Sequence, residues 1–284
     1  MTFLNVIKDK TEVQNLLDEQ REKSSKIVLV PTMGNLHDGH LSLIELAREQ
    51  ADYVVVSIFI NPSQFTDNKD FENYPRTLES DIEKLSLANA DLLFLPECLS
   101  IYPYGVDYAT QVIVPEMSND LCGKVRPGHF EGVTSIVSRL FNIIKPDFAV
   151  FGQKDFQQKL LIERMAIDLS LGIKIIGAPI IREKNGLALS SRNQHLSSVT
   201  KLTAVKLYKI LLEASSAVKN RQVEFLSIQR EAESRLINYG FSVDYISIRS
   251  RIDLSIPDED SKELIILASV VIDDIRLIDN IIID

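Results

Sequence analysis

The sequence predicts an α/β protein with a doubly wound parallel sheet, followed by a second, smaller α+β domain. In the first two thirds of the chain, β-branched runs alternate with amphipathic helical segments, as in sheets whose parallel strands are joined by crossover helices. After Arg182 the pattern changes to two amphipathic helices followed by two strands. The first domain is therefore predicted to span residues 1–182 and the second residues 183–284.

The first domain is predicted from its apolar runs. Ile27–Pro31 and Tyr53–Ile60 are typical of strands that are covered on both faces of a parallel sheet, and a helix with its N-cap at Asp38 joins them. Ligands are expected at the carboxyl ends of such strands. The alternation continues with a helix over 77–89, strands at 92–95 and 111–114, a helix with an apolar stripe from Val133 to Ile144, a strand at 148–151, a helix that ends before Gly172, and a strand at 174–178.

The second domain is predicted to contain helices over residues 199–220 and 223–239 and strands near 243–249 and 264–271. Its segment Leu264–Ile272 is the longest apolar stretch of the chain, at nine residues including a serine. A membrane span needs about 20 apolar residues. We therefore expect a buried strand here and no membrane anchor.

Net charge restricts the partners of the protein. The 284 residues include 31 basic and 40 acidic side chains, which give a net charge of −9. Binding to nucleic acid or to an anionic membrane depends on lysine and arginine neutralising phosphates, and the field of this chain opposes it. No nucleic-acid or membrane partner is expected, and any bound phosphate must be held by local groups.

Cysteine usage and the N-terminal residues indicate the compartment. Cys98 and Cys122 form no paired motif, and residues 1–9 lack a basic leader followed by an apolar core. The expected location is the reducing cytoplasm.

The segment PTMGNLHDGH (Pro31–His40) follows the first predicted strand, and the chain contains neither the GxGxxG fingerprint nor a P-loop. His37 and His40 flank Gly39 where a helix begins, so their imidazoles and the first backbone N–H groups suit a phosphate. The structural alternative is that both histidines only cap and pack the helix start. Two of the four histidines of the chain fall in this one motif, which favours function.

Two further segments have the chemistry of an anion site. In FGQKDFQQ (151–158), Gly152 permits a tight turn and Lys154 can place a compact charge on a phosphate oxygen, although turn lysines are usually only solvated. In LSSRN (189–193), two hydroxyls and a guanidinium suit an oxyanion, and the alternative is an ordinary helix entry rich in serine and asparagine. NPSQF (61–65) and RPGHF (126–130) are weaker signals, because either can be a plain turn or loop.

Together these segments resemble the pantothenate synthetases, the ATP-dependent pantoate–β-alanine ligases, in order from residue 31 to residue 280. The HxGH element alone is shared by a wider nucleotidyltransferase superfamily and by class I aminoacyl-tRNA synthetases, so the narrower resemblance rests on NPxQF, RPGHF and GxKDFQQ. The resembling segments are PTMGNLHDGH (31–40), SIFINPSQF (57–65), YPRT (74–77), RPGHF (126–130), FGQKDFQQ (151–158), GLALSSRN (186–193) and RLIDN (276–280).

The resemblance implies a Rossmann-like first domain, a second domain that closes over ATP, and a homodimer formed through the first domain. It also implies a two-step reaction. The carboxylate of (R)-pantoate attacks the α-phosphorus of ATP and releases pyrophosphate, and the amine of β-alanine then displaces AMP from pantoyl adenylate. Mg²⁺ is expected to arrive on the ATP phosphates with few protein ligands, and the sequence does not identify which residues they are.

The same resemblance implies roles for single residues. His37, His40 and Lys154 are the expected catalytic residues, with His40 as the proton donor. Gln64 and Gln158 are the expected ligands of pantoate, Gln64 also contacts β-alanine, and Tyr74, Arg126 and His129 are possible accessory residues. The expected ATP-binding residues are Met33, Gly34, Asn35, Leu36, His37, Asp38, Gly39, His40, Gly152, Gln153, Lys154, Asp155, Ile181, Leu189, Ser190, Ser191 and Arg192.

Gln153 departs from the family pattern, which usually has glutamate at this position. Its neutral amide removes one negative charge beside Lys154. We expect a modest change in ATP affinity rather than a loss of activity.

Three other functions explain part of the sequence. Another small-molecule nucleotidyltransferase with an HxGH motif explains the two histidines but not NPSQF or Gln157 and Gln158. A tRNA synthetase needs more positive surface than a chain of net charge −9 offers. A non-catalytic nucleotide sensor could discard His40 or the glutamines, and this chain retains them.

Overall fold

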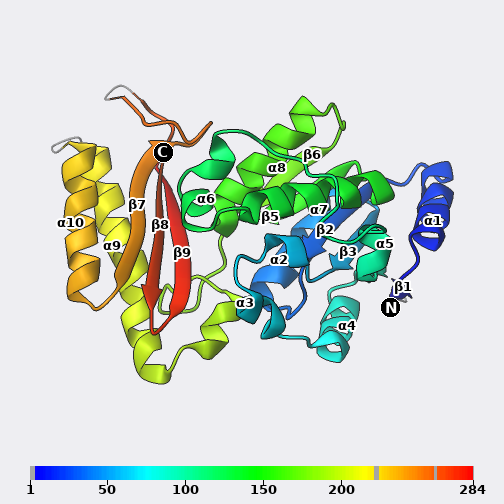
Figure 1. The fold of residues 1–284 in the computed structure, drawn as a ribbon, viewed down its shortest axis with the longest axis horizontal. Coiled ribbons are helices and arrows are strands. Elements are labelled where there is room, and N and C mark those ends of the chain that lie inside the picture. The colour runs from blue at the N-terminus through cyan, green and yellow to red at the C-terminus, as the bar shows by residue number, and fades with distance from the viewer. Residues whose placement is uncertain (1–3, 221–223, 259–260, 284) are drawn as a thin grey trace. The chain divides into compact units, whose positions relative to one another are not determined.

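The computed structural model describes residues 4–220, 224–258 and 261–283 (Figure 1). It contains a six-stranded parallel sheet and a three-stranded antiparallel sheet. By backbone contacts the chain forms two units. The first comprises Met1–Gln153 and Gln158–Pro179, and the second comprises Lys154–Gln157 and Ile180–Asp284. The mixed α/β class predicted from the sequence is confirmed, whereas the predicted boundary at 182/183 stays a prediction.

The parallel sheet of the first unit has the strand order β1-β4-β3-β2-β5-β6. The chain moves outward from β2 through β3 to β4, and later returns to the other side of β2 with β5 and β6. The order therefore reverses between β2 and β5, and at such a switch point ligands bind beyond the carboxyl ends of the strands. The strands are β1 (Asn5–Ile7), β2 (Ile27–Thr32), β3 (Tyr53–Ile58), β4 (Leu92–Phe94), β5 (Phe148–Gly152) and β6 (Lys174–Ala178).

The sheet of the first unit is buried on both faces. Val28 and Val30 of β2 pack in one cluster with Leu43 and Ile44, and the intervening Leu29 is also fully buried, on the opposite face. The helices are α1 (Lys10–Glu22), α2 (Asp38–Gln50), α3 (Asn68–Glu72), α4 (Leu78–Leu87), α5 (Cys98–Ile101), α6 (Cys122–Val125), α7 (His129–Ile144) and α8 (Phe156–Asp168), the last of which begins at the two residues grouped with the second unit.

The second unit is a three-stranded meander backed by two helices, α9 (Ser198–Asn220) and α10 (Phe225–Asn238). Its strands are β7 (Ser242–Ser250), β8 (Leu264–Ile272) and β9 (Ile275–Ile283), and alternate apolar residues of β8 pack in one core with both helices. A two-residue turn joins β8 to β9, and both of its residues, Asp273 and Asp274, have positive φ, as a type I′ hairpin turn requires. Leu264–Ile272 is therefore the buried strand that its composition predicted.

Several sequence predictions need correction. The strand predicted at 111–114 does not form, because the backbone of Val112 bonds instead to the side chains of Thr134 and Ser135 on α7. The N-cap of α2 is His37 and not Asp38. The short β1, the helix α1 and the whole of β9 were not predicted. Residue 223, at which the second helix of the second domain was predicted to begin, and residues 1–3 lie outside the described residues.

No helix among the described residues combines the length and the apolar composition needed to cross a bilayer.

Candidate functional site

The loop after β2 brings the chain into the N-terminus of α2 at the switch point of the sheet. Gly34 and Asn35 have φ values of +82° and +50°, a backbone conformation that glycine and asparagine tolerate best. The hydroxyl of Thr32 accepts from the N–H of Gly34 at 3.2 Å and donates to the carbonyl of Ser57 on β3 at 2.9 Å. The turn is therefore fixed to two neighbouring strands before the histidines begin.

His37 and His40 form a reciprocal cap at the start of α2. The Nδ1 atom of His37 accepts from the N–H of Gly39 at 3.1 Å, and the Nδ1 atom of His40 accepts from the N–H of His37 at 3.3 Å. The ring centroids are 4.2 Å apart. Because both Nδ1 atoms accept from backbone donors, each neutral ring carries its proton on Nε2. Both histidines therefore cap the helix start, as the structural alternative expected. The same contacts orient two Nε2–H donors at a helix N-terminus.

Two side chains of α4 clamp the turn that leads into these histidines. The carboxylate of Asp81, which is 1% exposed, accepts from the N–H groups of Asn35 and Leu36 at 2.9 and 2.8 Å. One turn later, the Nζ atom of Lys84 donates to the carbonyl of Leu36 at 2.7 Å. An added Cβ at Gly34 would lie 3.1 Å from Asp81, so the loop has little room to move. Asp81 was not predicted from the sequence, although an acidic residue on the apolar side of a helix is a detectable signal.

Replacing Asp81 with asparagine is expected to lower the free energy of unfolding by about 1.5–3 kcal/mol, because an amide has one acceptor oxygen where the carboxylate has two. Chemical denaturation measures the free energy, and hydrogen exchange at the amides of Asn35 and Leu36 should accelerate. The matched control is Glu79→Gln, which makes the same chemical change at an exposed position of α4. Unchanged exchange at both amides in the Asp81→Asn variant would contradict the clamp.

Gln64, predicted to bind pantoate and β-alanine, is held in a buried polar network after β3. The Nδ2 atom of Asn61 donates to the Oε1 atom of Gln64 and to the carbonyl of Gly132, both at 3.1 Å. The hydroxyl of Tyr102 donates to the Oδ1 atom of Asn61 at 2.7 Å, and burial raises the pKa of Tyr102. The Nε2 atom of Gln64 faces the sulfur of Met33 at 3.0 Å. A thioether is a weak acceptor, so a carboxylate is the better partner for this N–H donor.

The start of α7 supports the same network. The side chain of Arg126 donates to the Nε2 atom of His129 at 2.9 Å, so Nδ1 carries the proton and donates to the carbonyl of Gln64 at 2.7 Å. A Cβ at Gly132 would lie 2.3 Å from the carbonyl oxygen of Ser63, so only glycine permits this approach. Of the predicted accessory residues, His129 therefore contacts the backbone of Gln64, and Arg126 fixes the tautomer of His129.

Tyr74, the third predicted accessory residue, packs against the residue that follows Gln64. Its ring meets that of Phe65 edge-on, with centroids 5.8 Å apart. Gln158, the other predicted pantoate ligand, lies in the first turn of α8 and is half-buried.

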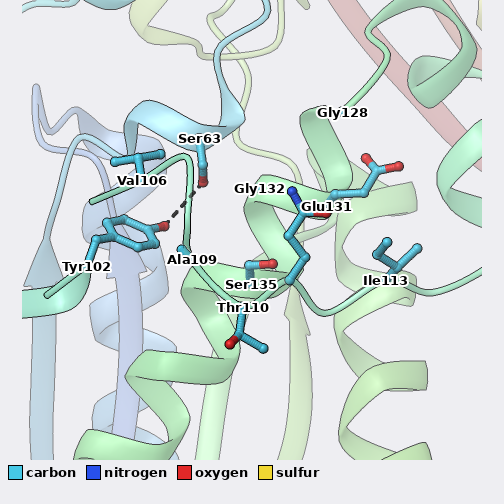
Figure 2. A pocket seen from close by; sticks show the side chains of 11 residues that line it. Ser63, Tyr102, Val106, Ala109, Thr110, Ile113, Gly128, Glu131, Gly132 and Ser135 are labelled. Atoms are coloured by element: carbon cyan, nitrogen blue, oxygen red, sulfur yellow. Dashed lines mark hydrogen bonds between the residues drawn. The ribbon is translucent and has the colours of Figure 1, made fainter. Parts of the chain in front are cut away.

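A pocket of 350 Å³ borders the polar network (Figure 2). Its wall includes Ser63 and Tyr102, whose hydroxyls lie 3.2 Å apart, together with Glu131 and Ser135 of α7. Among the described residues, those predicted to bind ATP or pantoate do not line this pocket. From the segment RPGHF (126–130), Gly128 lines it. The predicted residues lie instead at the strand ends and in the segments of the second unit.

The end of β5 approaches α2 closely. A Cβ at Gly152 would lie 4.0 Å from Leu43, and the side chain of Gln153 lies over Gly177 on β6. Gln153, the departure from the family pattern, thus places its amide beside Gly177 of the neighbouring strand.

In the second unit, the remaining predicted ATP-binding residues gather in one segment. The N–H of Leu189 donates to the carbonyl of Ile181 at 2.9 Å, and the hydroxyl of Ser190 caps the short helix Ser191–His195 by accepting from the N–H of Arg192 at 3.3 Å. This segment therefore also forms the ordinary helix entry that was the alternative to an oxyanion site. Lys154 is 18% exposed, and its Nζ atom lies 3.8 Å from Asp155.

Metal ligation is not evident in the described part of the chain, where no group of three or more histidine, cysteine, aspartate or glutamate side chains is placed to hold an ion.

Comparison with known proteins identifies full-length relatives. The family model described as pantoate-beta-alanine ligase matches residues 5–282. A pantothenate synthetase from Methylococcus capsulatus is 46% identical over 280 residues, covering 99% of this chain and 98% of the relative. One from Wigglesworthia glossinidia brevipalpis is 46% identical over 97% of this chain and 98% of its own length.

Two solved structures match nearly all of the fold. Pantothenate synthetase from Thermus thermophilus superimposes with a TM-score of 0.90 at 37% identity, covering 98% of both chains. Pantoate-beta-alanine ligase from Francisella tularensis, complexed with beta-gamma ATP and beta-alanine, superimposes with a TM-score of 0.83 at 35% identity, covering 99% of this chain and 98% of its own.

Proposed function

Because this chain belongs to the pantoate–beta-alanine ligase family, we propose that it is a ligase that condenses (R)-pantoate with β-alanine to form pantothenate while ATP is converted to AMP and pyrophosphate. The observation that carries this proposal is the full-length match to that family, which the geometry after β2 supports. There, two imidazole Nε2–H donors are oriented at a helix N-terminus, where phosphate binds well.

In the first step, a carboxylate oxygen of pantoate attacks the α-phosphorus of ATP. A carbon-bound oxygen gains a bond to phosphorus as the bond between the α-phosphorus and the bridging oxygen breaks, and pyrophosphate leaves with that oxygen and its electron pair. Negative charge grows on the leaving group, so donors already in place stabilise the transition state more than the ground state. We assign this role to His37 and His40, which donate hydrogen bonds from Nε2–H to the oxygens of the leaving group. Because the Nδ1 atom of His40 accepts from the N–H of His37, its neutral ring keeps the Nε2 proton, and we propose hydrogen-bond donation in place of the proton transfer that the resemblance implies.

Gln64 and Gln158 hold the pantoate carboxylate in this proposal. A salt bridge to lysine or arginine would neutralise the nucleophile, whereas a neutral amide orients it and leaves most of its charge available. Gln64 is suited to this task, because Asn61 fixes its Oε1 atom and the weakly accepting thioether of Met33 faces its Nε2 donor. Gln64 also contacts β-alanine.

In the second step, the amine of β-alanine attacks the acyl carbon of pantoyl adenylate. The carbon–nitrogen bond forms, the nitrogen loses a proton, and the bond between the acyl carbon and the AMP oxygen breaks. AMP leaves with one oxygen that came from pantoate. The protein's contribution here is to hold the two reactants together and to exclude water.

ATP is proposed to bind as its Mg²⁺ complex, with the ion held mainly by phosphate oxygens and water. Lys154 supplies positive charge to the phosphates. The other residues that we assign to ATP are those predicted from the sequence in Met33–His40, Gly152–Asp155, Ile181 and Leu189–Arg192.

The proposal is tested by incubating the purified protein with ATP, Mg²⁺, (R)-pantoate and β-alanine. AMP, pyrophosphate and pantothenate should form in equal amounts, and steady-state AMP formation should require both organic substrates. Sustained pyrophosphate release that needs no amine would favour the alternative of another HxGH nucleotidyltransferase. No AMP formation under any of these conditions would overturn the proposal.

We also propose that the enzyme is a cytoplasmic homodimer formed through the first unit. Four large side chains within residues 99–113 are more than half exposed, which provides apolar surface for a second copy. The variant Tyr108→Asp with Ile113→Asp should therefore have the monomer mass in light scattering, whereas Leu202→Asp, at an exposed apolar site of α9, should leave the dimer intact. A monomeric wild-type protein at micromolar concentration would contradict the dimer. The four side chains are Leu99, Tyr104, Tyr108 and Ile113.

A further inference from the structure

Strand β9 holds the backbone of Lys154. The turn Lys154–Gln157 follows β5 in the sequence, yet by contacts it groups with the second unit. The side chain of Asn280 on β9 is 3% exposed, and its Nδ2 atom donates to the carbonyl of Lys154 at 3.0 Å. Asn280 belongs to RLIDN, a segment to which the proposed function assigns no role.

The preceding residue of β9 holds a second segment. Asp279, 4% exposed, accepts two hydrogen bonds from the guanidinium of Arg182, at 2.6 and 2.8 Å. The same guanidinium lies 3.7 Å above the ring of Tyr208 and donates to the carbonyl of Gly186 at 3.2 Å. Arg182 directly follows Ile181, whose carbonyl accepts from Leu189, so this anchor fixes the start of the segment that leads to Ser190–Arg192.

Asp279 and Asn280 are also tied to each other. The N–H of Asn280 donates to the Oδ1 atom of Asp279 at 2.8 Å, and the carbonyl of Asn280 accepts from Arg182 at 3.4 Å. Side chains of successive strand residues point to opposite faces, so one step along β9 reaches two separate segments. Both segments carry residues that we assign to ATP: Lys154 to its phosphates, and Ser190–Arg192 to the nucleotide.

From this arrangement we infer that Asn280 is a positioning residue for Lys154 in the adenylation step. The inference rests on the proposed function, because it takes Lys154 as a ligand of the ATP phosphates. A lysine has a flexible four-carbon stem, and its charge is useful only if the backbone that carries it is fixed. The amide of Asn280 provides that fixed point, and Asp279 holds the second ATP-binding segment in place through Arg182.

The variant Asn280→Asp tests the inference. It keeps the size of the side chain but places a carboxylate oxygen against the carbonyl oxygen of Lys154. We expect kcat/KM for ATP to fall by about 10- to 100-fold, measured as pyrophosphate release, because displacement of a phosphate-binding group by about 1 Å can cost this much. KM for β-alanine should stay within about twofold, since Lys154 acts before the amine attacks.

A double-mutant cycle separates positioning from a purely structural role. If Asn280 acts through Lys154, then Asn280→Asp should slow single-turnover pyrophosphate release in the wild-type background and have almost no further effect in a Lys154→Ala background. If the two losses instead multiply, the inference is overturned. Asn280→Ser removes the same hydrogen bond without adding a charge, and it carries the same expectations if Asn280→Asp does not fold.

The matched control is Asp244→Asn on β7. Asp244 accepts from Ser269 at 2.7 Å and from Arg276 at 2.8 Å, so its loss disturbs polar contacts of the same sheet that do not include Lys154. It should lower Tm while leaving kcat/KM for ATP within about threefold, and an equal loss in this control would overturn the inference. Failure of the proposed function is distinguishable, because it shows as a wild-type protein that makes no pantothenate. An active wild type with an unaffected Asn280→Asp variant overturns only the inference.

Discussion

Replacing His40 with alanine is expected to lower the rate of pantoyl adenylate formation by about 10²–10³-fold, which corresponds to about 2.7–4 kcal/mol of lost transition-state stabilisation. The imidazole is oriented by its cap, in which Nδ1 accepts from the N–H of His37. Its Nε2–H donor is therefore in place before the reaction, and no free energy is needed to orient it in the transition state. Single-turnover pyrophosphate release, with ATP and pantoate but without β-alanine, measures this step directly.

The cap itself requires a control, because alanine also removes the acceptor for the N–H of His37. Glutamine at position 40 can keep a capping-box contact, so His40→Gln should retain most of the stability and still lose the imidazole chemistry. His195→Ala makes the alanine change at an exposed histidine and should leave the rate within about twofold. If His40→Ala forms the adenylate at a near-normal rate, the assigned role of His40 is wrong.

Lys154→Ala is expected to lower kcat/KM for ATP by about 10²–10³-fold, the effect typical of removing one charged group that stabilises a phosphoryl transition state. The loss should appear in the adenylation step, whereas aminolysis of pantoyl adenylate supplied directly should continue at about the wild-type rate. Rapid-quench measurement of the two half-reactions separates these outcomes.

Lys159→Ala is the matched control for this variant. Lys159 is as buried as Lys154, with 17% of its side chain exposed against 18%, but it is paired with Glu163 at 2.6 Å on α8. Its loss should change kcat/KM for ATP by no more than about threefold. Equal losses in the two variants would mean that Lys154 has no special place at the phosphates.

The sheet of the first unit was largely predictable because its strands are buried on both faces. Continuous apolar runs therefore appear in the sequence, and the predicted strand at 174–178 matches β6 residue for residue. The strand predicted at 111–114 was wrong for a reason of tertiary structure. The N–H and carbonyl groups of Val112 form hydrogen bonds with side chains of α7 and are not paired with a neighbouring strand. Strand β9 was missed because Arg276, Asp279 and Asn280 interrupt its apolar pattern, and two of these residues hold other segments of the chain.

The candidate site was predictable only where its residues lie close together in the sequence. His37 and His40 share one helix start, so their spacing alone places them together. Asp81 contacts a loop 46 residues away, and Asn280 contacts a carbonyl 126 residues away. Local patterns contain no information on such pairings, which arise when separate elements pack. The predicted chemistry was thus visible in the sequence, and the contacts that position it required the fold.

The fate of one oxygen atom tests the adenylate mechanism. If the enzyme activates pantoate as an adenylate, pantoate labelled with ¹⁸O in both carboxylate oxygens must transfer one label to AMP and keep the other in the new amide of pantothenate. Mass spectrometry of both products measures this. An adenylate intermediate predicts one ¹⁸O atom in each AMP molecule formed, and AMP without label, at normal pantothenate yield, would contradict that intermediate.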